Sequence, residues 1–336
     1  MELLTPNEPY TLTPLPCTLP FMDPKRILLI VFKGIGDVLL TTPLIRALKK
    51  RHPSAEIFFL TKKPSEKILR NNPLVSGIII RGKGALKRIR ALKLDTVIDF
   101  MRSAPSGWYT RLSGAKQRIA FHYPLGFFFY NIMPRYRDRG YTVHNRLRLL
   151  EPLDVRDGDI KLDLNFTGEN AAKADAFLAA ANLDPAKDLI ITFDITSPRG
   201  HRMWPGEKFA TLADALSEKL GARIIFLAGP GELNCVKKAL AAAARPHLVA
   251  ADFDLLDLAA FFKRVKLHVG TTSSPMHIAV SQGAPTFTVY GARNGPENWG
   301  PPLALHGYAQ GDLAGLAPDE VFEKIKRHLE SLGILI

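Results

Sequence analysis

The chain has 336 residues, of which 46% are hydrophobic and 23% charged, and its formal net charge at pH 7 is +13. These proportions are ordinary for a globular protein, and the length exceeds the usual size of one domain, so we expect two domains. Two cysteines, Cys17 and Cys235, are too few for a disulfide framework or a cysteine-rich metal site, which fits a reducing cytoplasm. No apolar run approaches the roughly 20 residues that span a bilayer.

Positive charge is concentrated in the first half of the chain. Residues 1–165 contain 28 Lys and Arg against 14 Asp and Glu, a net charge of +14, whereas residues 166–336 contain 17 against 18, a net charge of −1. Such asymmetry indicates an anionic partner for the first half, either a nucleic acid, an anionic membrane surface or a phosphorylated substrate. The alternative is that these basic side chains only solvate the surface.

Residues 1–24 are rich in Pro and Thr and have no basic start followed by an apolar core, so we interpret them as a mobile leader and not as a signal peptide. From there on, short apolar strands alternate with helices. Strands are predicted at residues 26–32, 56–60, 78–80, 96–100 and 118–121, with one helix that runs to about residue 51 and others at 85–92, 108–112 and 143–150. The continuous apolar run of residues 26–32 is typical of a buried strand in a parallel sheet.

Polar residues follow two strands of this first half. Lys33 and Asp37 come after the first strand, in a glycine-containing turn, and Arg102 and Ser103 come after the fourth. Ligands of open α/β sheets bind at the carboxyl edge of the strands, so these side chains are candidates for a site. Asp37 is either a functional carboxylate at the mouth of the turn or simply a cap of the following helix.

The glycines of the same turn invite a dinucleotide-binding interpretation, which fits poorly. A G-x-G-x-x-G fingerprint that begins at Gly34 requires Gly or Ala at a position that is Leu39 in this chain. The second strand is followed by Lys62 and Lys63 instead of an acid that binds ribose. A nicotinamide-dependent oxidoreductase is therefore disfavoured.

Aromatic and basic residues are interleaved in residues 123–141. Residues 127–130 read Phe-Phe-Phe-Tyr, and Arg135, Arg137 and Arg139 follow. This mixture suits the interface of an anionic membrane, and it also suits contact with a nucleic acid. The alternative is that the Phe run fills the domain core and the arginines solvate a loop.

The second half repeats the alternation, so we expect two consecutive doubly wound domains with a cleft between facing carboxyl edges. Strands are predicted at residues 189–193, 223–228, 265–269 and 285–290, and helices at 168–181, after 205, at 254–262, 275–282 and 317–332. The loop after the first of these strands contains Thr196, Ser197 and Arg202, and Glu232 opens the helix after the second.

A turn of four hydroxyl residues, 271–274, joins a strand to a helix whose first turn contains Pro275. Such a turn presents free backbone N–H groups and the positive end of a helix dipole to an anion, for which a phosphate or diphosphate is the natural choice. An ordinary capped helix is the alternative. The sequence contains no catalytic Cys–His pair, zinc spacing, Walker loop or G-x-S-x-G elbow.

Six groups of residues occur in order along the chain: KGIGDVLLTTP, DFMRSAPSGWYTRLSGAKQRIAF, FYN with a later HNRLRLL, WPGEKFATLADAL, LAGPGE and SSPMHIAVSQGAPTFTVYG. Together they resemble glycosyltransferase family 9, the ADP-heptose:lipopolysaccharide heptosyltransferases. The similarity runs from about residue 25 to the end of the chain.

This resemblance implies a GT-B fold, in which two Rossmann-like, doubly wound domains face each other across a cleft. Residues 25–160 would bind the acceptor and residues 161–336 the nucleotide sugar. The implied reaction moves heptose from ADP-heptose to a lipopolysaccharide core acceptor with inversion, with Asp37 as general base and no required metal or cofactor. The implied partners are the nucleotide sugar, the anionic acceptor and the cytoplasmic surface of the inner membrane, and no nucleic acid is expected.

On this basis the donor-binding residues are predicted to be Thr196, Ser197, Arg202, Glu232, Thr272, Ser273, Ser274 and His277. The acceptor-binding residues are predicted to be Lys33, Arg102, Ser103, Arg135 and Arg137.

The chain departs from the family pattern at one place. The usual motif is Asp-Ser/Thr-Gly-Pro-Met-His, and here Thr272 replaces the aspartate and Ser274 the glycine. The resemblance implies that this aspartate touches the donor sugar or diphosphate, and that the glycine permits close backbone approach. A different donor or acceptor, or a divergent member that binds a nucleotide sugar without catalysis, therefore stays open as an alternative.

Overall fold

The computed structural model describes residues 23–136, 140–293, 295–302 and 304–335. Most of the predicted leader, and Arg137 among the predicted acceptor residues, lie outside the described residues. In the described part of the chain, no helix is long and apolar enough to cross a membrane.

The first half forms a five-stranded parallel sheet. Its strands are β1 (Arg26–Ile30), β2 (Glu56–Thr61), β3 (Gly77–Ile80), β4 (Thr96–Asp99) and β5 (Gln117–Ile119), in the order β3-β2-β1-β4-β5. Successive side chains of a strand point to opposite faces, and both Leu28 and Leu29 of β1 are completely buried. The sheet is therefore covered on both faces, which explains the continuous apolar run that predicts β1.

The helices of this half are α1 (Ile35–Leu39), α2 (Thr42–Arg51), α3 (Glu66–Arg70), α4 (Ala85–Ala91), α5 (Ala104–Leu112) and α6 (Thr142–Leu147). The prediction of one continuous helix up to residue 51 was wrong. Pro43 has no N–H to donate to the carbonyl of Leu39, and the Thr42 hydroxyl donates to that carbonyl instead, at 2.8 Å. The chain therefore breaks between α1 and α2, which leaves α1 as a short helix that begins beside the end of β1.

The second half forms a six-stranded parallel sheet. Its strands are β6 (Ile190–Asp194), β7 (Arg223–Leu227), β8 (Leu248–Ala250), β9 (Leu267–Gly270), β10 (Thr286–Gly291) and β11 (His306–Gly311), in the order β11-β10-β9-β6-β7-β8. Renumbered within the half, this is the 3-2-1-4-5-6 order of a Rossmann sheet. The two edge strands β8 and β11 were not predicted, because β8 is an apolar segment of only three residues and β11, with the sequence HGYAQG, has no apolar run.

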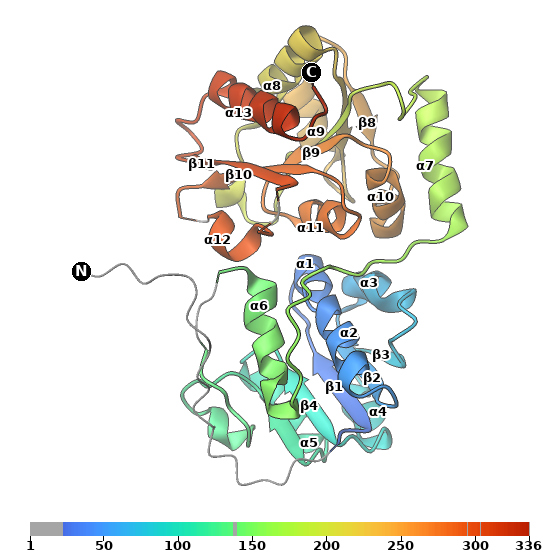
Figure 1. Cartoon of the computed structure of the whole chain (residues 1–336), viewed down its shortest axis with the longest axis vertical. Helices are drawn as coiled ribbons and strands as arrows, with labels where there is room; N and C mark the ends of the chain where they lie inside the picture. The colour runs from blue at the N-terminus through green and yellow to red at the C-terminus, as the bar shows by residue number, and fades with distance from the viewer. Residues whose placement is uncertain (1–22, 137–139, 294, 303, 336) are drawn as a thin grey trace, which may run out of the picture.

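Helices cover both faces of the second sheet (Figure 1). They are α7 (Gly168–Ala180), α8 (Gly206–Leu220), α9 (Leu233–Leu240), α10 (Leu255–Phe262), α11 (Ser274–Ser281), α12 (Pro296–Trp299) and α13 (Pro318–Ser331). α8 packs on α9 and α13, and α10 packs on α7 and α11. The strands and their covering helices are thus arranged as a doubly wound domain, as predicted.

The two halves are in contact, with α1 opposite α11 (Figure 1). One cluster of buried apolar side chains extends from β1 and α2 to α10 and α11. Polar contacts also cross the boundary: Lys67 pairs with Asp254 at 2.6 Å, and the Thr142 hydroxyl donates to the backbone oxygen of Asn298 at 2.7 Å. The division of the chain at residue 160 stays a prediction.

Candidate active site

The carboxyl edges of the two sheets meet at the boundary between the halves. α1 follows β1, α11 follows β9, and these two helices contact each other (Figure 1). In each sheet the winding direction reverses beside these strands, between β1 and β4 and between β6 and β9. Ligands of doubly wound sheets bind at such switch points, so this junction is the candidate site.

Asp37 lies in the first turn of α1 and is paired with Arg146 of α6. Arg146 Nη2 donates to Asp37 Oδ1 at 2.6 Å, and Nη1 donates to the Asp37 backbone oxygen and, at 2.8 Å, to the hydroxyl of Thr41. Only 19% of the Asp37 side chain and 11% of the Arg146 side chain are exposed. Burial lowers the pKa of Arg146, and the neighbouring Asp37 carboxylate opposes that shift. The pair fixes the orientation of the Asp37 carboxylate at the mouth of the first sheet.

His277 of α11 approaches α1 from the other half. A Cβ atom at Gly36 would lie 2.8 Å from His277 Cδ2, so a glycine is needed for this close contact. Only 4% of His277 is exposed, and its Nδ1 has no hydrogen-bond partner among the described residues. Burial lowers the pKa of His277 to about 4, with Arg146 acting in the same direction and Asp37 in the opposite one. His277 is therefore a neutral hydrogen-bonding group near pH 7.

Arg202 brings a second cation to the junction. It ends the 3-10 turn η4 (Gly200–Arg202), and its guanidinium carbon lies 6.0 Å from the ring centre of Trp299 in α12. The Trp299 ring is in turn 6.4 Å from the His277 ring. Burial lowers the pKa of Arg202, and the Asp37 carboxylate opposes that shift. Three predicted site residues, Asp37, His277 and Arg202, are thus brought to one place from both halves.

A second polar cluster lies at the carboxyl ends of β6 and β9. Asp194, the last residue of β6, is 3% exposed and accepts hydrogen bonds from the backbone N–H and hydroxyl of Thr196, both at 3.4 Å, and from the hydroxyl of Ser273. Ser273 is the N-cap residue of α11, but its side chain makes no cap hydrogen bond to the helix. The first N–H groups of α11 are therefore not used by that side chain, which is the arrangement that suits an anion.

The remaining predicted donor residues lie around this cluster. Glu232 accepts the Gly229 N–H at 2.8 Å in the turn before α9, and Ser197 accepts the Arg199 N–H at 3.2 Å. Thr272 is 9% exposed, and Ser274 is the first residue of α11. The acid that the family motif implies at position 272 is absent, whereas the neighbouring strand ends in the buried Asp194.

Replacing Asp194 by Asn is expected to raise the free energy of unfolding relative to the original protein, and this difference should grow as the pH rises. Burial raises the pKa of Asp194 to about 7, with Ser273 opposing this shift and Glu232 adding to it. Between about pH 4 and pH 7 the unfolded chain has released a proton that the folded chain still holds, so the free energy of unfolding falls as the pH rises. Asp194→Asn removes this loss and is expected to gain on the order of 2–4 kcal/mol relative to the original protein between pH 4 and pH 8.

Urea unfolding at a series of pH values measures this difference. The matched control is Asp252→Asn, because Asp252 is an exposed carboxylate of the same half. Parallel pH curves for the original protein and Asp194→Asn would contradict the assignment of a neutral, buried carboxyl at Asp194.

The predicted acceptor residues are more scattered. Lys33 and Arg135 are exposed, and Arg102 has a left-handed backbone (φ 52°) with its guanidinium 6.0 Å from the ring centre of Tyr136. Ser103 is the N-cap of α5, where its hydroxyl accepts the Ser106 N–H at 3.4 Å. Capping alone accounts for Ser103, and a role of these residues in acceptor binding stays a prediction.

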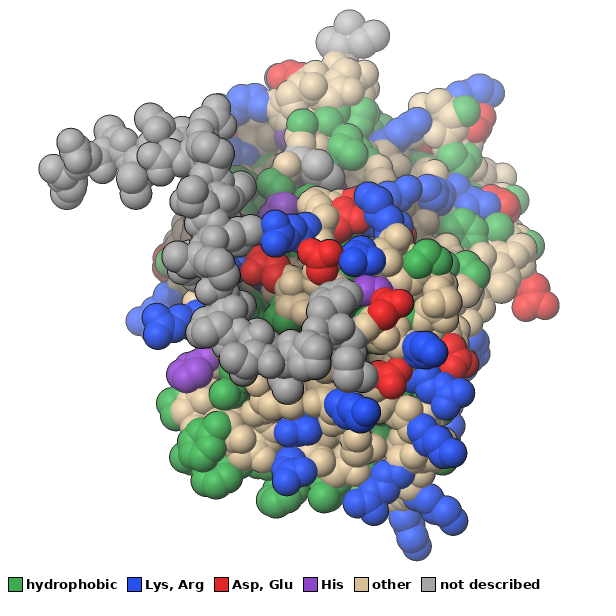
Figure 2. Space-filling model, turned by 60° about the horizontal axis from the view of Figure 1, so that its bottom comes forward, with side chains coloured by type: hydrophobic (Ala, Val, Ile, Leu, Met, Phe, Trp, Pro, Cys, Tyr) green, Lys and Arg blue, Asp and Glu red, His purple; other side chains and the backbone are tan. Residues whose placement is uncertain are grey.

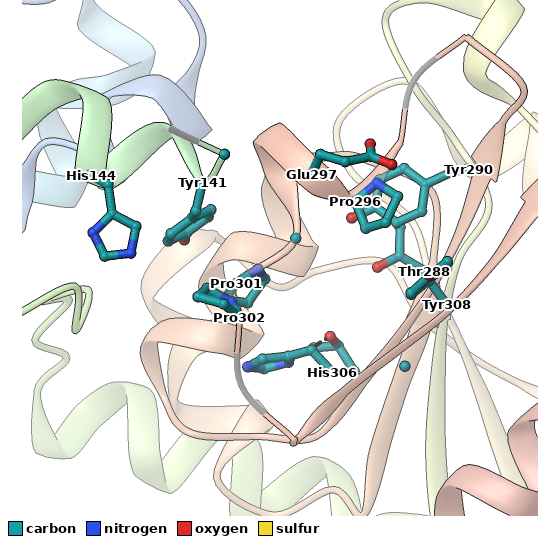
Figure 3. Close-up of a pocket in the computed structure, with 14 residues that line it drawn as sticks. Tyr141, His144, Thr288, Tyr290, Pro296, Glu297, Pro301, Pro302, His306 and Tyr308 are labelled. Carbon is teal, nitrogen blue, oxygen red and sulfur yellow. Dashed lines mark hydrogen bonds between the residues drawn. The ribbon is translucent and has the colours of Figure 1, made fainter. Parts of the chain in front are cut away.

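A cavity of about 560 Å³ lies at the same boundary, between the start of α6 and the β10–β11 edge of the second sheet. Tyr141 and His144 face it from the first half, and Tyr290, His306 and Tyr308 line it from the second (Figure 3). None of the predicted site residues lines it. The described residues contain no group of three or more His, Cys, Asp or Glu side chains placed to hold a metal ion.

Two solved glycosyltransferase structures share this architecture over nearly their whole length. A family 9 glycosyltransferase from Veillonella parvula matches with a TM-score of 0.80 at 24% identity, over 91% of this chain and 97% of its own. The ADP-heptose lipopolysaccharide heptosyltransferase II of E. coli matches with a TM-score of 0.76 at 18% identity, over 92% of this chain and 99% of its own. The fold is therefore of the GT-B type, with two Rossmann-like α/β domains.

Comparison of the amino-acid sequence identifies the family. The family model described as glycosyltransferase family 9 (heptosyltransferase) matches residues 84–307, two thirds of the chain. The chain belongs to glycosyltransferase family 9, as the order of its motifs predicts. Among curated proteins, lipopolysaccharide heptosyltransferase 3 of Escherichia coli K12 is 27% identical over 280 residues, which are 76% of this chain and 80% of the relative.

Proposed function

We propose that this protein is an inverting heptosyltransferase that moves heptose from ADP-heptose to a lipopolysaccharide core acceptor, with Asp37 as general base. The observation that carries the proposal is the Asp37–Arg146 pair, which stands at the mouth of α1 and faces His277 of the opposite half. The names of the relatives, lipopolysaccharide heptosyltransferases from several bacteria, support heptose as the sugar and lipopolysaccharide as the acceptor, and ADP-heptose is named for the similar E. coli heptosyltransferase II.

In this mechanism an acceptor hydroxyl gives its proton to the Asp37 carboxylate while its oxygen attacks the anomeric carbon of the donor sugar. The bond from that carbon to the diphosphate breaks, and the nucleoside diphosphate leaves. Attack opposite the leaving group inverts the anomeric centre. Arg146 donates to Asp37 Oδ1, and Asp37 Oδ2 accepts the Gly34 N–H at 3.3 Å, so the carboxylate is held in one orientation and a remaining lone pair can take the proton.

The leaving diphosphate gains charge as the bond breaks, and this charge needs donors and a cation. The α11 N-terminus at Ser273 and Ser274 would provide backbone donors, and Arg202 would provide the cation. Arg202 is suited to this role because a guanidinium presents a planar fork of donors to phosphate oxygens. The domain assignments follow from these roles, with the acceptor on the first half and the nucleotide sugar on the second.

A different nucleotide sugar is the second candidate, and Thr272 and Ser274 favour it. A hydroxyl replaces a carboxylate at position 272, so contacts to the donor sugar that an acid would make are altered. The buried Asp194 lies one strand away and brings an acid to the same edge of the sheet. The sugar pocket of this chain therefore need not accept the same sugar as its relatives.

Thermal unfolding with a panel of nucleoside diphosphates and nucleotide sugars separates these candidates, because a ligand that binds only the folded chain raises the melting temperature. At a ligand concentration of about 100 times Kd the expected stabilisation is about 2.7 kcal/mol. We expect a shift with ADP and a larger one with ADP-heptose.

The control variant is Arg202→Ala, which should reduce the shift with every diphosphate while leaving the melting temperature without ligand nearly unchanged. A shift with another nucleotide sugar but not with ADP-heptose would replace the donor and keep the mechanism. The absence of any shift would contradict both candidates and favour a divergent member without nucleotide-sugar binding.

A further inference from the structure

Large apolar side chains are exposed together on the first half. They are Leu125, Phe127 and Phe128 of the loop around the 3-10 turn η2 (Gly126–Phe128), which are 62%, 62% and 60% exposed, and Trp108 and Leu112 of α5, which are 56% and 37% exposed. We call these five residues the aromatic patch. The exposure of Phe127 and Phe128 contradicts the interpretation that the Phe run only fills the domain core.

The fold holds this loop with the aromatic side chains outward. Tyr130 is 2% exposed and its hydroxyl donates to the buried Asp99 at 2.5 Å, while Arg118 Nε donates to the backbone oxygen of Phe129 at 2.9 Å. The Phe129 ring packs on Gly107 so closely that a Cβ there would lie 2.5 Å from it. The loop is thus anchored at Phe129 and Tyr130, and the two preceding rings are left at the surface.

The two parts of the aromatic patch adjoin each other. The Trp108 ring meets the Phe129 ring edge-on at 5.3 Å, and the Phe127 and Phe128 rings are 4.3 Å apart. Leu125 has a left-handed backbone (φ 65°), a conformation that costs free energy for a leucine. A costly backbone that turns apolar side chains toward water is hard to explain by folding alone and points to a function for the surface.

Basic side chains lie on the same segments of the chain as the aromatic patch. Arg111 lies three residues after Trp108 on α5, so it projects from the same side of that helix, and Arg111, Lys116 and Arg135 are exposed. Figure 2 shows hydrophobic side chains at the surface at the lower left, with Lys and Arg side chains beside them and more at the lower right. The first half as a whole carries a net charge of +14.

We propose that the aromatic patch docks the protein on an anionic lipid bilayer. Phe127 and Phe128 would enter the boundary between headgroups and acyl chains, Trp108 would lie at headgroup level, and the arginines and lysines of the same segments would pair with lipid phosphates. The charge favours a bilayer over a second copy of this chain, because two such surfaces would repel each other. This inference deepens the proposed function, since a lipid-anchored acceptor lies at such a surface, but its test needs neither donor nor acceptor.

Sedimentation of the full chain with lipid vesicles tests the proposal. We expect binding to vesicles of phosphatidylcholine mixed with phosphatidylglycerol, much weaker binding to phosphatidylcholine alone, and release at high salt. The double variant Phe127→Ser/Phe128→Ser is expected to bind mixed vesicles at least about tenfold more weakly, because two large apolar groups no longer enter the bilayer. Tyr308→Ser, which removes a 51% exposed aromatic of the second half, is the matched control and should bind normally.

Two further measurements keep the outcomes distinct. Trp108 fluorescence in the full chain should be quenched by lipids that carry bromine on their acyl chains, and Trp108→Phe should lose that part of the quenching. Equal melting temperatures of the double variant and the original protein would show that the double variant folds.

Vesicle binding unaffected by the double variant, or a concentration-dependent dimer that the double variant abolishes, would overturn the proposal. A loss of vesicle binding with nucleotide-sugar binding intact would separate this surface from the site at Asp37.

Discussion

Asp37→Asn is expected to lower kcat by about 10²–10⁴-fold while leaving the affinity for the nucleotide sugar within about twofold of the original value. Asparagine has nearly the same shape as aspartate and keeps an oxygen that can accept from Arg146, so that contact should survive, whereas the 3.3 Å hydrogen bond from the Gly34 N–H to Asp37 Oδ2 is lost. It has no oxygen that can take a proton from the acceptor hydroxyl. The loss would therefore fall on the chemical step and not on binding.

The measurement is steady-state transfer with a confirmed donor and acceptor, together with donor binding by calorimetry. Asp163→Asn is a matched control, because Asp163 is also a partly buried carboxylate that pairs with an arginine of the first half, Arg46. The control should lose stability but little activity per folded molecule. Full activity of Asp37→Asn would remove Asp37 as the base and leave the Arg146 pair as a structural contact only.

The fold was predictable to the extent that buried parallel strands are continuous apolar runs. β1 and β6 are such strands, and their positions follow directly from the sequence. β11, with the sequence HGYAQG, has no apolar run because it is an edge strand with only Ala309 buried. The break between α1 and α2 was missed because Pro43 was counted within a helix, although its missing N–H ends the preceding one.

The candidate site was predictable where a residue lies next to a glycine turn or a helix start, as Asp37 and His277 do. Arg146 and Asp194 were missed, because what distinguishes them is a partner far away in the sequence. Arg146 reaches Asp37 over 109 residues, and Ser273 reaches Asp194 over 79. In a chain with 45 Lys and Arg, nothing local separates Arg146 from a surface arginine. The polar end of an otherwise apolar strand was the available signal for Asp194.

Arg146→Ala is expected to lower kcat by about 10–100-fold and to destabilise the protein by about 1.5–3 kcal/mol. The guanidinium donates to the carboxylate of Asp37, to its backbone oxygen and to Thr41, so its removal leaves three acceptors without that partner and frees the carboxylate to rotate. A misplaced base reduces the fraction of bound acceptor in a reactive geometry. Arg46→Ala is the matched control, since Arg46 also makes an arginine–aspartate pair, but with Asp163 in place of Asp37, and its removal should cost stability alone.

Arg146→Lys distinguishes positioning from a requirement for charge alone. This variant keeps the positive charge but not the planar fork, because an ammonium group is a point charge that donates in no fixed plane. It is therefore expected to recover kcat only in part. An Arg146→Lys enzyme with full kcat would mean that charge alone is needed. An Arg146→Ala enzyme with normal kcat per folded molecule would mean that Arg146 acts on the fold and not on the base.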